Sequence, residues 1–107
     1  MQDSITKILK AIADPTRREI FHVLVLATTA LPISQISNQF DMTRQGVTKH
    51  IKNLEQAGLV KIQDKGRERY CTANANPLQL LNQWIGFYEK FWDGTLQNLD
   101  SYLDTKS

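Results

Sequence analysis

Apolar residues recur along most of this chain at spacings of three and four, a pattern typical of amphipathic helices. The predicted helices span residues 4–13, 15–27, 33–40 and 43–57. Asp14 and Thr43 each stand directly before a predicted helix, where their side-chain oxygens can cap it. Pro15 suits the first helical position, since the N–H it lacks is not needed there. Residues 28–32 are expected to form a connector.

After Gly58 the apolar pattern changes to alternation, which indicates β-strands. Strands are predicted over 59–64 and 68–72, joined by a turn at Lys65-Gly66-Arg67. A last helix is predicted from Pro77 to about Leu103. The fold class is therefore mainly α with a small β-hairpin wing, in the order α-α-α-α-β-β-α. The third and fourth helices, joined by a tight turn, make a helix-turn-helix, and the hairpin makes it winged.

The helix over 43–57 has two different faces. Val47, Ile51 and Leu54 form one apolar stripe, which we expect to lie on the core. The other faces carry hydrogen-bond donors: Arg44, Gln45, Thr48, Lys49, His50 and Lys52. A solvated face usually mixes Glu with Lys, but no carboxylate occurs from Thr43 to Leu54. The pattern thus favours an anionic partner over a simply solvated surface.

The net charge of +2 implies no polyanion partner by itself, but its distribution is uneven. Residues 41–70 hold seven basic and four acidic groups, whereas residues 77–107 hold two basic and four acidic groups. The wing contributes Lys65, Arg67 and Arg69 around Gly66. A major groove admits one helix, and a basic hairpin can lie against phosphates or the minor groove. We therefore predict that the helix and the wing bind double-stranded DNA.

The residues predicted to contact DNA are Thr43, Arg44, Gln45, Thr48, Lys49, His50, Lys52, Lys65, Arg67 and Arg69. Among them, those in the first turns of the helix are placed to read bases. Arg44, Gln45 and Thr48 are assigned to base edges. Lys49, Lys52, Lys65 and Arg67 are assigned mainly to phosphates.

Three blocks together resemble the ArsR-type winged-helix transcriptional regulators: ADPTRREI at 13–20, TRQGVTKHIKNLEQAGLV at 43–60 and GRERYC at 66–71. The resemblance covers residues 5–75 closely and the helical tail by general pattern. It implies a homodimeric bacterial repressor that binds a palindromic operator. Metal-sensing members carry a Cys-x-Cys pair before the turn, but LPISQISNQF has no cysteine. Others use His and Asp on the last helix, whereas the histidines here are His22 and His50. No metal site and no cofactor are expected.

The last predicted helix carries two adjacent apolar rows and both tryptophans of the chain. Such a helix can pack only one side against its own small domain, so the second apolar row is expected to pack against another protein surface. We predict that segments 1–13 and 77–104 contribute to a homodimer; burial within the monomer is the alternative. The predicted interface residues are Ile5, Ile8, Ile12, Leu81, Trp84, Ile85, Tyr88, Phe91, Trp92 and Leu99.

Composition restricts the remaining possibilities. Residues 1–107 have the length and apolar content of one ordinary soluble domain, with no signal peptide or membrane span expected. One cysteine, Cys71, allows no internal disulfide and fits the cytoplasm. Two histidines and one cysteine supply no catalytic set, so an enzyme is not expected. The rival function is a winged-helix protein–protein interaction module. Target genes, inducing signal and effector do not follow from the sequence.

Overall fold

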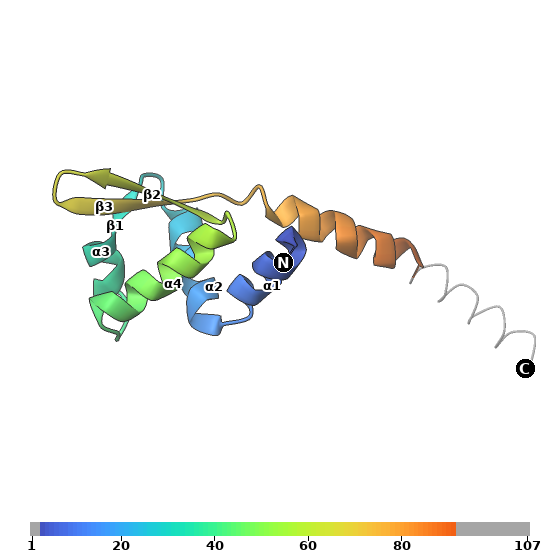
Figure 1. Ribbon diagram of the computed structural model, residues 1–107, viewed down its shortest axis with the longest axis horizontal. Coiled ribbons are helices and arrows are strands. Elements are labelled where there is room, and N and C mark those ends of the chain that lie inside the picture. Colours follow the sequence, from blue (N-terminus) through green and yellow to red (C-terminus); the bar gives the residue numbers. More distant parts are fainter. Residues whose placement is uncertain (1–2, 92–107) are drawn as a thin grey trace, which may run out of the picture.

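The computed structural model describes residues 3–91, and Figure 1 shows their arrangement. The elements are α1 (Ser4–Ile12), α2 (Pro15–Leu26), β1 (Leu31–Pro32), α3 (Ile33–Asn38), α4 (Arg44–Gln56), β2 (Val60–Lys65) and β3 (Glu68–Ala73). A C-terminal helix begins at residue 78 and is described through residue 91. The expected mainly α fold with a helix-turn-helix and a wing is confirmed. The predicted continuation of the last helix to Leu103 lies outside the described residues.

Side-chain caps fix where three of the helices begin. The Asp14 carboxylate accepts a hydrogen bond from the Arg17 backbone N–H at 3.0 Å, and Pro15 occupies the first turn of α2. The Thr43 hydroxyl accepts one from the Gly46 N–H, also at 3.0 Å. Both caps were expected from the sequence. A third cap, from Asp3 to the Thr6 N–H at 2.7 Å, starts α1.

The apolar stripe of α4 lies at the centre of the core. Val47, Ile51 and Leu54 have no solvent-exposed surface. Around them pack the buried residues Ile8, Ala11, Ile20, Leu24, Ile33, Ile36, Leu59, Val60, Cys71 and Leu81, contributed by the other helices and the sheet. No polar or charged residue of the described part is buried. The hydrophobic contacts of its stripe therefore fix the rotation of α4 about its own axis.

Gly58 stops α4 and directs the chain into the wing. Its φ of 80° is in the left-handed region that favours glycine. The Leu59 N–H donates to the Leu54 carbonyl and the Gly58 N–H to the Glu55 carbonyl, both at 2.9 Å. These are the two bonds of a Schellman motif. The wing is thereby attached to the end of α4 by a connection of defined geometry.

The sheet has three strands rather than the two predicted, in the order β1-β3-β2, all antiparallel. The predicted connector at 28–32 includes β1, in which Leu31 pairs with Cys71 and Pro32 with Tyr70. Two residues are too few to show alternation, and proline has no N–H to donate to a ladder. Proline is tolerated here because β1 is an edge strand. The helix α3 ends at Asn38, two residues before the predicted end.

The tip of the wing is a two-residue turn, because Lys65 pairs with Glu68 across Gly66-Arg67. Gly66 has a φ of 64°, and no non-glycine residue of the described part has a positive φ. Glycine with a positive φ at the first central position is the signature of a type II′ hairpin turn.

The C-terminal helix projects from the end of the domain opposite the wing (Figure 1). Leu78 and Leu81 attach its first turn to the core. Beyond that turn the described residues are mostly exposed. None of the described helices has the length and apolar character that crossing a membrane requires.

Shortening a side chain of the buried stripe tests its role in fixing α4. We expect Ile51→Ala to lower the free energy of unfolding by about 2–5 kcal/mol, because it leaves a cavity in the core. The neighbouring exposed residue provides the control, and Lys52→Ala should change stability little. Chemical denaturation of both variants measures the difference. Equal stabilities would contradict the packing described for Ile51.

Candidate nucleic-acid interface

Polar side chains at the start of α4 gather at the surface. Thr43, Arg44, Gln45 and Thr48 line one open hollow. Gly46 belongs to the same turn of the helix, and a Cβ there would come within 3.2 Å of the Met42 Cε and the Thr43 Oγ1. A small residue at this position thus allows the turn and the helix start to approach closely. The first turn of α4 contains no acidic residue, so the helix itself places only hydrogen-bond donors and its positive dipole end at this surface.

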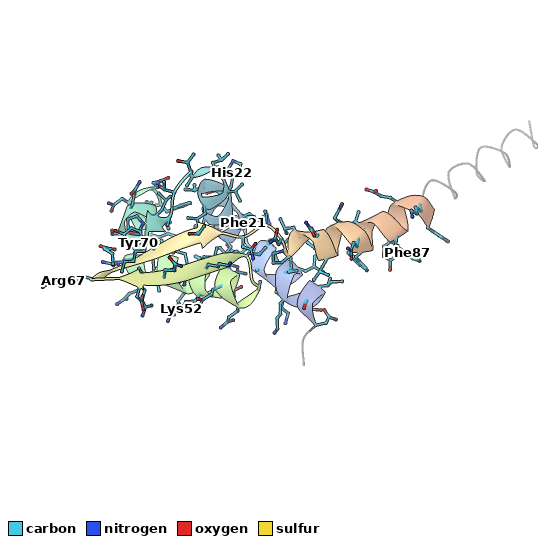
Figure 2. All side chains as sticks on the ribbon, turned by 90° about the horizontal axis from the view of Figure 1, so that it is seen from above. Phe21, His22, Lys52, Arg67, Tyr70 and Phe87 are labelled. Atoms are coloured by element: carbon cyan, nitrogen blue, oxygen red, sulfur yellow. The ribbon has the colours of Figure 1, made fainter. Side chains whose placement is uncertain are left out.

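The predicted DNA-contacting residues of α4 differ in solvent exposure and in the hydrogen bonds they already make within the helix. Lys49 and Lys52 are exposed, and Figure 2 shows Lys52 on the outside of the domain. The Thr48 hydroxyl donates to the Arg44 carbonyl at 2.8 Å, within the helix itself. Thr48 therefore offers its methyl group and oxygen lone pairs to a partner. This matches contact with a thymine methyl better than donation to a base.

The wing presents its three predicted cations differently. Arg67 stands at the tip of the hairpin (Figure 2). The Lys65 Nζ lies over the Tyr70 ring, 5.9 Å from its centroid. The Arg69 guanidinium forms an ion pair with the carboxylate of Asp64, its cross-strand partner, at 3.2 Å. Its charge is thus partly neutralised, which leaves Lys65 and Arg67 as the stronger attraction for phosphates.

A carboxylate that the sequence analysis did not single out reaches the reading end of α4. Glu68, the first residue of β3, lies with its Oε2 atom 3.6 Å from the Arg44 guanidinium. Its Oε1 accepts a hydrogen bond from the Ser34 hydroxyl of α3 at 3.3 Å. The wing, α3 and α4 therefore meet at one acidic side chain. Glu68 and Ser34 are 34 residues apart, so no local sequence pattern indicates this contact.

His50 is half-buried and faces the junction of α1 and α2. Its Nδ1 lies 3.4 Å from an Arg17 nitrogen, and arginine can only donate, so Nδ1 is the acceptor. Arg17 also donates to the carbonyls of Ala11 at 2.7 Å and Lys10 at 2.9 Å. The backbone N–H of Arg17 lowers the pKa of the Asp14 carboxyl below its ordinary value. One arginine thus joins the end of α1, the start of α2 and the middle of α4.

The predicted dimer residues fall into two groups. Ile8 and Leu81 are buried in the core of the single chain, and Ile5 and Ile12 pack against it. By contrast, Trp84, Ile85, Tyr88 and Phe91 are 43–70% exposed, and Leu80 and Phe87 on the same helix are 41% and 67% exposed. Trp92 and Leu99 lie outside the described residues. The exposed aromatic rings form a cluster, since Tyr88 makes edge contacts with both Trp84 and Phe87 at about 5 Å.

The histidine and cysteine side chains of the described part do not come together in a metal-binding group. Residues 3–91 contain no group of three or more His, Cys, Asp or Glu that could hold a metal ion. His22 is exposed on α2 (Figure 2). Cys71 is fully buried in β3.

Comparison with known proteins agrees with this geometry. Residues 12–63 match the helix-turn-helix domain family. The chain is 40% identical over 84 residues to the HTH-type transcriptional regulator YuzN of Bacillus subtilis strain 168, a match covering 73% of this chain and 91% of YuzN. It is 28% identical over 81 residues to the transcriptional repressor SdpR of the same organism, covering 76% and 88%. A crystal structure of an ArsR family transcriptional regulator is similar with a TM-score of 0.77 at 28% identity, covering 85% of this chain and 98% of that one.

The burial of Cys71 leads to a reactivity prediction. Burial, and secondarily the charge of Glu55, raises the pKa of the thiol from 9.0 to about 11. Alkylation requires the thiolate, so at pH 8 the native protein should react at least about 100-fold more slowly than the unfolded chain. Timed alkylation followed by mass measurement, with and without denaturant, checks this. Similar rates in both states would show that the thiol is accessible and ionised in the fold.

Proposed function

Because this chain belongs to the ArsR-type winged helix-turn-helix transcriptional regulators, we propose that it binds a palindromic DNA operator as a homodimer and represses transcription. Regulators of this kind are not enzymes, and this one would act on DNA in the cytoplasm. The similarity to SdpR, a transcriptional repressor, supports repression. The observation that carries the proposal is the exposed start of α4, whose own residues include no carboxylate, beside a wing tip that presents Lys65 and Arg67.

In the proposed complex the two surfaces have different tasks. The start of α4 enters the major groove, where the long side chains of Arg44 and Gln45 reach base edges. Thr48 contacts the same region through its methyl group. The exposed cations Lys49, Lys52, Lys65 and Arg67 contact phosphates, which position the protein and supply sequence-independent affinity.

We assign dimerisation to the end of the molecule opposite the wing. The exposed rings of Trp84, Tyr88 and Phe91 and the side chain of Ile85 offer apolar surface that a second copy would cover. Joining two copies here leaves both α4 helices free. Two-fold symmetry then requires two half-sites in the operator, about 34–36 Å apart if they lie one DNA turn from each other.

Substitutions in α4 and in the wing should produce different losses. Arg44→Ala or Gln45→Ala should cost about 1–3 kcal/mol of operator binding and relax discrimination at one base position. Arg67→Ala should weaken binding to operator and random duplex alike, and reduce the salt slope by about one for each protomer, which is about two for the dimer. Binding of each variant to a duplex selected from a random pool, and to its scrambled version, measures this across a salt series.

Lys7→Ala provides a charge-matched control for that experiment. Lys7 lies on α1 beside Asn53, toward the C-terminal end of α4, so its removal should leave discrimination and slope nearly unchanged. If the variants of α4 and of the wing all bind like the parent, the donor face is only a solvated surface. The protein–protein interaction module then becomes the better account.

The proposed dimer is tested by removing an exposed aromatic side chain. Trp84→Ala and Tyr88→Ala should each weaken association at least about tenfold, because buried aromatic residues at interfaces contribute about 2 kcal/mol or more. Asn82→Ala, at an exposed polar position of the same helix, should leave association unchanged. Sedimentation at micromolar concentration measures all three. A parent protein that sediments as a folded monomer would contradict the assignment.

A further inference from the structure

Glu68 is an acidic side chain at a surface where basic side chains predominate. It follows the wing tip directly, and its side chain is 36% exposed. A carboxylate in such a position repels a polyanion and lowers affinity for any DNA. General attraction to DNA therefore does not explain why a carboxylate occupies this position.

The contacts of Glu68 show what its charge can do. Ser34 donates to Oε1, which fixes the carboxylate against α3. The Oε2 atom is buried and accepts no hydrogen bond within the described part, but it lies 3.6 Å from the Arg44 guanidinium. This oxygen therefore has an acceptor site free, directed at the side chain assigned to a base edge.

This ion pair is a weak source of stability. Arg44 is 56% exposed, and solvent-exposed ion pairs contribute little to folding. The ion pair can still contribute to binding by orienting Arg44. An arginine side chain loses rotational freedom about several bonds when it is fixed on a base, and this loss costs binding free energy. A carboxylate that is itself held in place by the hydrogen bond from Ser34 removes part of that loss before DNA arrives. Guanidinium has five N–H donors, so it can contact both Glu68 and the two acceptors of a guanine edge.

We propose that Glu68 is a positioning residue that orients Arg44 toward a base edge, so that it raises sequence discrimination while lowering affinity for DNA in general. Because Glu68 is the first residue of β3, the position of the wing affects the orientation of Arg44. The inference rests on the proposed function, because it requires Arg44 to read a base.

Glu68→Gln is the central test, since glutamine keeps the length and the acceptor for Ser34 but removes the charge. The ratio of affinities for the selected duplex and its scrambled version should fall about five- to thirtyfold, with binding to the scrambled duplex unchanged or tighter. The matched control is Asp64→Asn, which removes the other wing carboxylate, one that contacts Arg69 instead of α4. It should strengthen binding to both duplexes alike and leave the ratio unchanged.

A double-mutant cycle separates orientation from repulsion. In an Arg44→Ala background, Glu68→Gln should change the ratio no further. Glu68→Asp keeps the charge but shortens the reach to Arg44, so it should lose discrimination without a change in net charge. Glu68→Asp also provides the test of the charge contact if Glu68→Gln does not fold. Thermal unfolding of each variant shows whether it is folded.

The outcomes distinguish this inference from the one on which it rests. If Arg44→Ala loses discrimination but Glu68→Gln does not, the positioning role of Glu68 is wrong and the reading role of Arg44 stands. An equal loss of the ratio on Glu68→Gln with and without Arg44 would show that Glu68 acts independently of Arg44, which would also contradict the positioning role. If Arg44→Ala itself keeps full discrimination, the reading role of Arg44 fails, and the role of Glu68 with it.

Discussion

The burial of Val47, Ile51 and Leu54 is the constraint on which the rest of this structure depends. These residues fix α4 against α1, α2, α3 and the sheet, and they determine which of its side chains face outward. A rotation of α4 by one residue would expose part of the stripe and bury charged groups, at a cost of several kcal/mol. The donor face is thus a consequence of packing on the opposite face.

Two polar contacts then connect this helix to its surroundings. At its start, Glu68 joins Arg44 to α3 and the wing. At its middle, His50 meets Arg17, whose guanidinium also binds the last carbonyls of α1. The first contact faces the proposed DNA surface, and the second faces the helix that lies beside the proposed dimer surface. Both contacts lie outside the hydrophobic core and connect polar side chains of α4 to neighbouring elements.

Most of the fold could be predicted from local sequence patterns. The features that could not be predicted depend mainly on contacts between residues far apart in the sequence. The stripe of α4, the caps Asp14 and Thr43, and the turn at Gly66 follow from spacing and residue type, and the structure contains all of them. The strand β1 was missed because two residues, one of them proline, show no strand period. The roles of Glu68 and Arg17 depend on partners 34 and 33 residues away, respectively. For the same reason, burial of Ile8 and Leu81 in the monomer core could not be separated from burial in a dimer.

The salt dependence of binding by the parent protein tests the central claim most directly. If the donor face of α4 and the wing tip bind DNA, four cations per protomer (Lys49, Lys52, Lys65 and Arg67) release counterions from the duplex. A dimer on the selected duplex should then show a slope of about −7 in log affinity against log salt concentration. A slope near zero would contradict the account, because it would mean that the donor face does not contact the phosphates of DNA.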